Sequence, residues 1–312
     1  MSIKAKPLIR KLGTIDLDMV EVTPLVINGR LYRFEYVRAD YHANKLGHSY
    51  FQFIDVAFGT ATEPFAPNYH FGSAFHHNGV TYVFGVLTVG GHTIKDTVQI
   101  FRSTDLIKWE EKTALKLPGW GIFNTSVCEG RDVFVMAFEI DSPPEECGVA
   151  FTIRFAVSKD LWNWELTPSE CVYSKDRYTA CPVIRYLPED GYYYMIYLEH
   201  LPGWGFASYI ARSADLIKWK RSPVNPVLMY DDLEDKKTAN FNLTKEQQNR
   251  IENALDINNS DVDFCEYQGR TIINYSWGNQ HGNEFLAEAI YDGSVSEFLR
   301  GFFDDWQGPV DV

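Results

Sequence analysis

The stretch Ser103-Thr104-Asp105-Leu106-Ile107-Lys108-Trp109 occurs three times in this chain in related form. It returns as Ser158-Lys159-Asp160-Leu161-Trp162-Asn163-Trp164 and again as Ser213-Ala214-Asp215-Leu216-Ile217-Lys218-Trp219. Both intervals are 55 residues, and the segments between the copies contain short β-type runs. A fixed period of about 40–55 residues with short strands is typical of propellers and related repeat folds.

The residue types of this phrase, S-x-D-L-x-x-W, indicate a structural role. Ser and Asp two positions apart favour side-chain-to-backbone hydrogen bonds in a turn. Leu and Trp then provide apolar surface that can pack one repeat against the next. A catalytic role for Asp105, Asp160 and Asp215 would require three identical sites, so we interpret these aspartates as turn residues.

A second recurring signal is a Gly-containing turn before an aromatic or β-branched run. It occurs five times, at Asn28-Gly29, Asn78-Gly79, Glu129-Gly130, Asp190-Gly191 and Gln268-Gly269. Five such turns predict an all-β fold, a single five-bladed β-propeller domain over residues 1–312, with blades of about 19–68, 69–123, 124–177, 178–259 and 260–305. The polar segment of about 231–259 reads as a helical insertion in blade 4, because Thr244 to Gln247 matches a capping box. We expect this insertion to act as a lid or a dimer contact.

Bulk composition narrows the partners and the compartment. Aromatic residues make up 15% of the 312 residues, which suits an all-β fold, and the formal net charge of −13 argues against nucleic acid and anionic membranes. No apolar run reaches the length of about 18 residues that a membrane span needs. The five cysteines form no C-x-x-C pair, and no signal peptide is visible. We therefore expect a cytoplasmic protein, or a secreted or periplasmic one if a leader has been removed.

In a propeller, the starts of the inner strands and the exits of the second strands meet at one end of the central channel. These segments carry carboxylates and imidazoles, which glycoside hydrolysis needs as acid and base. The catalytic candidates are Glu21, Asp40, Glu199, Asp261, Asp263 and His281. The substrate-binding candidates are Arg38, His92, Trp204, Trp277 and Gln280, with the two indoles suited to stack on a sugar. Structural alternatives stand beside these roles, such as an Arg38–Asp40 pair, a turn cap by Asp261 and Asp263, or a solvated loop acid at Glu199.

The five-blade frame and the S-x-D-L-x-x-W phrase resemble the five-bladed propeller glycoside hydrolases of family 43 (the arabinanase and xylosidase group) and their relatives. The segments 258–263 and 275–282 are similar to the family 117 anhydro-galactosidases. The resemblance covers nearly the whole chain. It implies an acidic general base starting an inner strand in blade 1, an Asp in a middle blade that tunes a pKa, a Glu as general acid further on, and an inverting mechanism.

The sequence departs from this family pattern at two positions. Thr23-Pro24 stands where an Asp-Pro is expected, and Ala180-Cys181-Pro182 stands where a Glu-Ala-Pro is expected. The catalytic set therefore does not transfer residue by residue. We assign a base to Glu21 or Asp40, a pKa modulator or base to Asp261 or Asp263, and an acid to Glu199 or His281.

These observations predict an exo-acting, inverting hydrolase of an oligosaccharide that needs no cofactor, while a divalent cation in the channel stays open. A homodimer stays open as well. The alternatives are a propeller phosphorylase, a non-catalytic carbohydrate-binding propeller, and a lyase that uses His and Tyr. No metal ligand is assigned, because the histidines of blade 2 lack a clean metal spacing.

Overall fold

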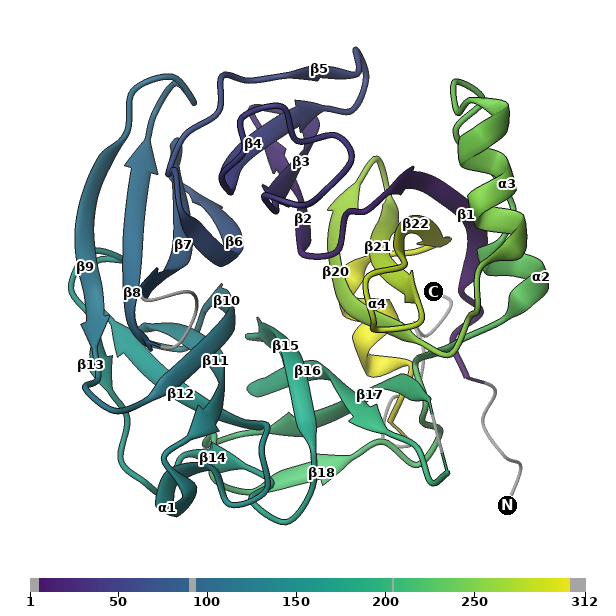
Figure 1. The fold of residues 1–312 in the computed structure, drawn as a ribbon. Helices are drawn as coiled ribbons and strands as arrows, with labels where there is room; N and C mark the ends of the chain where they lie inside the picture. Colours follow the sequence, from purple (N-terminus) through teal and green to yellow (C-terminus); the bar gives the residue numbers. More distant parts are fainter. Residues whose placement is uncertain (1–5, 90–93, 204, 304–312) are drawn as a thin grey trace.

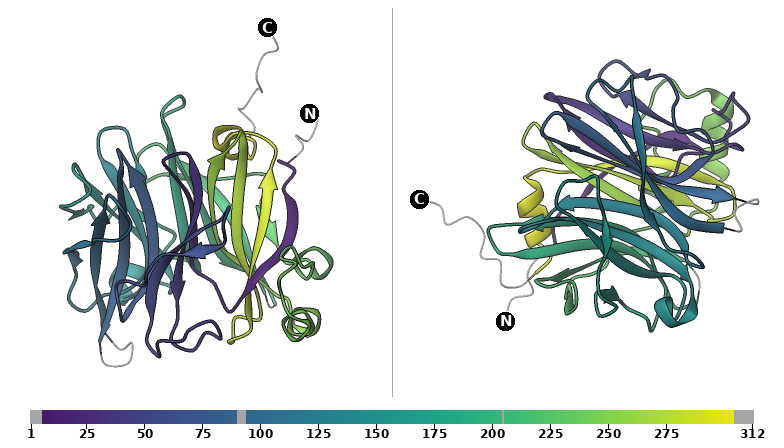
Figure 2. Two further views of the ribbon diagram at one scale, coloured as in Figure 1. Left: turned by 90° about the horizontal axis from the view of Figure 1, so that it is seen from above. Right: turned by 90° about the vertical axis from the view of Figure 1, so that its left-hand side faces the viewer.

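The computed structural model describes residues 6–89, 94–203 and 205–303, and within them the fold is almost entirely β. This confirms the predicted all-β class. The strands form antiparallel sheets that lie around a common centre (Figure 1). Seen from two further directions, the sheets stand side by side about this centre (Figure 2).

The strands nearest the centre begin each sheet. They are β2 (Val22–Ile27), β6 (Tyr69–His77), β10 (Gly121–Glu129), β15 (Thr179–Leu187) and β20 (Asn259–Tyr267). Each contacts the next around the centre, and β20 contacts β2. The same end of each strand therefore faces one opening of the central channel.

Each inner strand is joined by a Gly-containing turn to an antiparallel second strand, as the sequence predicts. The second strands are β3 (Arg30–Val37), β7 (Val80–Val89), β11 (Phe134–Ser142), β16 (Tyr192–His200) and β21 (Arg270–Gly278). At Asn28-Gly29 the φ angles are 50° and 76°. Positive φ at both positions is the geometry of a tight hairpin turn, which Asn and Gly tolerate.

Third strands follow outward from the second ones. They are β4 (Tyr50–Asp55), β8 (Ile94–Ser103), β12 (Thr152–Ser158), β17 (Phe206–Ser213) and β22 (Glu284–Tyr291). The outer edges carry the short strands β5 (Thr60–Ala61), β9 (Glu110–Lys116), β13 (Glu165–Leu166), β14 (Val172–Tyr173), β18 (Trp219–Arg221) and β19 (Leu228–Met229). The sheets of β6–β9 and β10–β14 are connected by one parallel bridge, Gly121 to Lys95.

The repeated phrase forms the turn after the third strand, and its aspartates are structural as predicted. Asp160 Oδ1 accepts hydrogen bonds from the backbone N–H groups of Trp162 and Asn163 at 2.9 and 2.8 Å, and Asp105 and Asp215 do the same in their turns. The Leu of each copy has φ between 58° and 62°. The Trp of each copy packs on an aromatic ring of the preceding sheet, as Trp219 does on Phe155 at 5.6 Å.

The strand β1 (Arg10–Leu17) was assigned to no blade in the sequence analysis. It forms the outer edge of the last sheet by antiparallel pairing with β22. The first and last parts of the described chain are therefore joined in one sheet (Figure 1). After β22 the chain forms helix α4 (Val295–Arg300), which Ser294 and Glu297 cap.

Helices also follow β11 and β19. Helix α1 (Pro144–Cys147) lies between β11 and β12, and helices α2 (Asp232–Asp235) and α3 (Lys245–Asn253) lie between β19 and β20, beside β1 (Figure 1). The predicted capping box is present, since the Thr244 side chain accepts from Gln247 N–H and the Gln247 side chain accepts from Thr244 N–H. None of the helices in the described ranges is long and apolar enough to cross a membrane.

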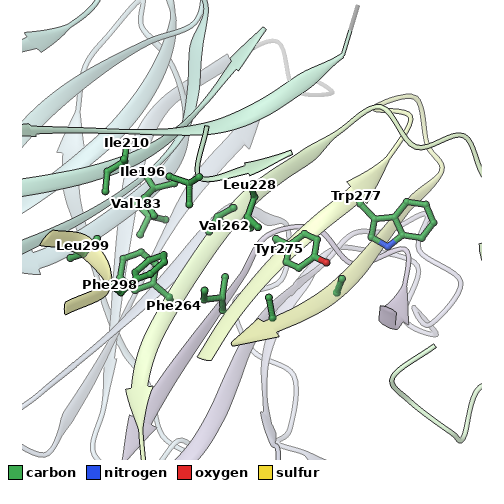
Figure 3. Close-up of a cluster of buried hydrophobic side chains, with 14 of the residues drawn as sticks. Val183, Ile196, Ile210, Leu228, Val262, Phe264, Tyr275, Trp277, Phe298 and Leu299 are labelled. Carbon is green, nitrogen blue, oxygen red and sulfur yellow. The ribbon is translucent and has the colours of Figure 1, made fainter. Parts of the chain in front are cut away.

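The largest hydrophobic cluster lies between the sheets of β15–β19 and β20–β22 and beneath α4 (Figure 3). Its largest side chain is Trp277, which is 0% exposed. The Trp277 ring stacks on Phe285 at 4.4 Å, and its Nε1–H donates to Thr14 Oγ1 at 2.8 Å. These contacts link β21, β22 and β1 within the last sheet.

Candidate active site

A narrow pocket of about 30 Å³ lies where the inner strands begin. It is lined by residues of all the inner strands: Glu21, Val22, Thr23, Gly72, Ser73, Asn124, Thr125, Cys181, Pro182, Val183, Asp261 and Asp263. The strands β6, β10, β15 and β20 carry bulges at this level. Bulges re-aim side chains and are common beside active sites. Cys181 and Asp261 lie within two of these bulges, each with a φ of 48°.

Glu21 is the carboxylate of the first sheet in this pocket. It is buried, and its Oε1 accepts from the Arg38 guanidinium at 2.6 Å. Arg38 also lies 3.5 Å from Glu284 Oε2, so its guanidinium forms ion pairs with two carboxyl groups. Burial raises the pKa of Glu21, Arg38 opposes this, and Asp261 adds to it. Burial likewise raises the pKa of Glu284 to about 7.

Glu139, near the end of β11, is a buried carboxyl group with two hydrogen-bond donors beside it. Its Oε2 accepts from the backbone N–H of Cys181 at 2.7 Å and from Asn124 Nδ2 at 3.3 Å. Burial raises its pKa to about 8, and the charges of Asp261 and Glu21 contribute. At neutral pH this group is therefore a protonated carboxylic acid.

Asp261 lies opposite on β20 and is partly exposed. Its Oδ2 accepts from Ser260 Oγ at 2.6 Å and from Ser276 Oγ at 3.4 Å, which orients the carboxylate. Burial raises the pKa of the Cys181 thiol well above its usual value, with Asp261 and Glu139 adding to the effect. Cys181 is therefore a neutral thiol between these two acids.

The other catalytic candidates lie apart from this group or have other partners. Asp263 faces the channel, where Arg185 Nη2 lies 2.5 Å from its Oδ1. Glu199 accepts from Tyr197 and from Arg221 Nη2, and lies 3.5 Å from Arg177 Nε. Asp40 is exposed in the turn after β3, close enough to raise the pKa of Glu284. His281 is exposed in the loop between β21 and β22. The structure thus brings Glu21 and Asp261 together and places Glu199 in a separate ion-pair cluster.

The substrate-binding candidates divide in a similar way. Arg38 contacts the pocket acids, and Gln280 Nε2 donates to Ser260 Oγ at 3.3 Å, one residue from Asp261. The expectation for Trp277 is wrong, because its indole is fully buried and no face is available to a sugar. His92 and Trp204 lie outside the described residues.

Two features of this site were missed or left aside by sequence reasoning. Glu139 was not among the catalytic candidates chosen from the sequence, and only the packing of β15 against β10 and β11 brings it beside Cys181. The second feature is a set of partly exposed rings at the same end of the channel: Phe71, Phe123, Phe151, Tyr178 and Phe206. Their separations in sequence give no periodic signal that would have grouped them.

Acids dominate this end of the channel. The carboxyl groups of Glu21, Glu139, Asp261 and Glu284 influence one another electrostatically, and Arg38 is the cation that contacts two of them. Within residues 6–89, 94–203 and 205–303, no cluster of three or more His, Cys, Asp or Glu residues is arranged to hold a metal ion. This arrangement supports general acid–base chemistry, in which one carboxyl group donates a proton to a substrate and another accepts one.

No known family model matches the sequence, and no curated protein matches it either. Solved structures do match over most of the chain. A thermostable family-43 glycoside hydrolase shares 10% identity, covers 88% of this chain and 90% of its own, and has a TM-score of 0.57. An α-L-arabinofuranosidase from Fusarium graminearum, in complex with an iminosugar inhibitor, shares 10% identity over 94% and 99% of the two chains with a TM-score of 0.58.

A third similar structure is an N-acetylgalactosamine deacetylase from F. plautii in complex with blood group B trisaccharide. It shares 13% identity, covers 97% of this chain and 98% of its own, and has a TM-score of 0.58. Identities this low show a shared fold. The resemblance to glycoside hydrolases that include family 43 is thereby confirmed at the level of the fold. Function has to be argued from the site.

Proposed function

We propose that this chain is a glycoside hydrolase built as a five-bladed propeller, with the segment that contains α2 and α3 inserted in blade 4. The cyclic contacts among the inner strands support five blades. The observation that carries the proposed activity is a group of interacting carboxyl groups at one end of the channel: Glu139, whose pKa is raised to about 8, and Asp261, which accepts a hydrogen bond from Ser260. Two carboxyl groups in opposite protonation states are what glycosidic hydrolysis requires.

In the proposed mechanism, Asp261 takes a proton from water and the oxygen of that water bonds to the anomeric carbon. Glu139 gives its proton to the leaving oxygen as the glycosidic C–O bond breaks. Glu21, neutralised in part by Arg38, keeps the site negative and helps to hold the Glu139 proton. The family resemblance favours inversion at the anomeric carbon, and we propose attack at a chain end. This chemistry needs no cofactor.

The acid assigned here differs from the family expectation. That expectation places the acid on an inner strand of blade 4, where this chain has Ala180, followed by Cys181 with its neutral thiol. Glu139 reaches the same neighbourhood from blade 3, since its Oε2 accepts from the Cys181 N–H. A relocated acid explains how the fold can keep the reaction without the Glu-Ala-Pro motif.

The test is hydrolysis of a panel of 4-nitrophenyl glycosides and neutral oligosaccharides by the wild type, Glu139→Gln and Asp261→Asn. We expect loss of about 10²–10⁴-fold in kcat for each variant. Proton NMR of the first-formed anomer reports inversion or retention. Activity within tenfold of the wild type in both variants would refute the assignment.

The replacement of the expected inner-strand Glu by Ala180 also favours a second candidate, a non-catalytic carbohydrate-binding protein. It predicts calorimetric binding of an oligosaccharide with no product after long incubation. The five cysteines are free, which supports a reducing compartment such as the cytoplasm for either function.

A further inference from the structure

One side of the channel opening is lined by a continuous row of aromatic rings, which we name the aromatic arc: Phe71, Phe123, Phe151, Tyr178 and Phe206. Successive ring centroids are 5.1, 4.8, 5.6 and 5.7 Å apart, with strongly tilted or edge-to-face planes. Each ring is partly exposed. Rings in such contact normally form a buried core, so a partly exposed row is a surface suited to stacking.

The arc borders the acids of the candidate site. Phe71 and Phe123 directly precede Gly72 and Asn124, which line the pocket. Tyr178 lies close enough to Asp261 for the charge of that carboxyl group to act on its hydroxyl. The other side of the opening carries Glu21, Arg38 and Glu284. The opening therefore has an apolar half, with rings on β6, β10 and β17 and directly before β12 and β15, and a charged half directly before β2, directly after β3 and on β22.

The two halves meet different parts of a substrate. A general acid must lie beside the oxygen of the leaving group, since it protonates that atom. Glu139 comes from β11 and contacts Cys181 and Asn124, on the apolar side of the opening. A leaving group attached to that oxygen would rest on the aromatic arc.

The charges near the arc favour an uncharged leaving group. Lys95 and Asp141 pair with each other at 3.4 Å, and the Lys95 ammonium already covers Phe123 at 3.7 Å from its ring centroid. Glu21, Asp261 and Glu284 face the same opening and would repel an anion such as a uronate. A ring with an apolar face can stack on the exposed parts of the arc, and this contact favours its binding.

We propose that the aromatic arc is the subsite for the leaving group, and that it selects an uncharged ring with an apolar face. This inference rests on the proposed hydrolase function. A neutral sugar of an oligosaccharide and the phenol ring of an aryl glycoside share this chemistry.

The test compares the wild type with Phe151→Ala, which removes the central ring, and Phe151→Tyr, which retains it. Substrates are neutral disaccharides, 4-nitrophenyl glycosides and methyl glycosides of the same sugar. Phe151→Ala should lower kcat/KM about five- to tenfold for leaving groups that contain a ring and less than twofold for the methyl glycoside. Phe151→Tyr should restore the wild-type ratio. The matched control is Phe58→Ala, which removes a residue that is 71% exposed in the turn between β4 and β5.

The two classes of ring-containing substrate identify the natural leaving group. A larger loss of kcat/KM on disaccharides indicates a sugar, and a larger loss on aryl glycosides indicates a phenol. Equal losses for ring and methyl leaving groups would overturn the subsite while the hydrolase function stands. If no glycoside is hydrolysed, the proposed function fails, and calorimetry with neutral disaccharides and 4-nitrophenol then tests the arc alone. Weaker binding by Phe151→Ala supports the subsite, whereas equal or undetectable binding to both proteins overturns it.

Discussion

Replacing Glu139 with Gln should make the protein more stable at neutral pH. Burial raises the pKa of Glu139 from 4.5 to about 8, so the folded protein must keep a proton that the unfolded chain releases. The stability of the wild type therefore falls as pH rises from about 4.5 to about 8. Gln is nearly the same shape as the protonated acid and takes up no proton, so its side-chain carbonyl can accept from the Cys181 N–H without this cost.

The magnitude follows from the interval between the two pKa values. Each pH unit is equivalent to about 1.4 kcal/mol. Between pH 5 and pH 8, the free energy of unfolding of Glu139→Gln should therefore rise relative to that of the wild type by up to about 4 kcal/mol. For a chain of 312 residues this is a difference in melting temperature of about 6 °C.

The assay is urea unfolding at half-unit steps from pH 5 to pH 8, followed by circular dichroism. Glu110→Gln is the control, since Glu110 is exposed and pairs with Arg102 at the surface. Its difference from the wild type should show no comparable slope. A Glu139→Gln difference that stays flat across this range would mean that Glu139 is ionised at neutral pH, and it could not then act as the proton donor.

Three further predictions use other parts of the molecule. Asp160→Ala removes the acceptor of two backbone N–H groups and should lower the free energy of unfolding by about 1–2 kcal/mol, while Asp160→Asn keeps most of it; urea unfolding distinguishes the two. Asp261→Asn should reduce kcat at least a hundredfold in a glycosidase assay and leave the melting temperature within a few degrees. Trp277→Phe should cost about 1–3 kcal/mol, because a buried bond to Thr14 and ring volume are lost, yet oligosaccharide binding measured by calorimetry should not change.

The parts of the fold that repeat were predictable, because their signals are local. The S-x-D-L-x-x-W turn is held by hydrogen bonds between residues two or three positions apart, as in Asp160 to Trp162 and Asn163. The Gly turns at Asn28-Gly29 and Asn78-Gly79 have positive φ at both residues, which Asn and Gly tolerate. Pairing of β1 with β22 has no local signal, since its partners are more than 260 residues apart, and it was not anticipated.

The site was predictable only in part, for the same reason. Glu21 and Asp261 start inner strands, so their place in the repeat put them at the opening. Trp277 also occupies an exit position, but packing against Phe285 and Thr14 turned its ring into the core. The repeat period predicts how far along a strand a residue lies. It does not predict toward which face of the sheet the side chain points.

The sequence by itself determined the β architecture, the repeat length and the end of the channel at which acids gather, because strand, turn and spacing signals lie within a few residues. Only the tertiary structure decided that Glu139 rests against the Cys181 N–H, holds a proton at neutral pH and lies beside the aromatic arc. These properties depend on burial, on the charges of Glu21 and Asp261 next to and on β2 and β20, and on a hydrogen bond from the backbone of β15. Desolvation and Coulomb effects from residues far away in the sequence cannot be predicted from the residues of one strand.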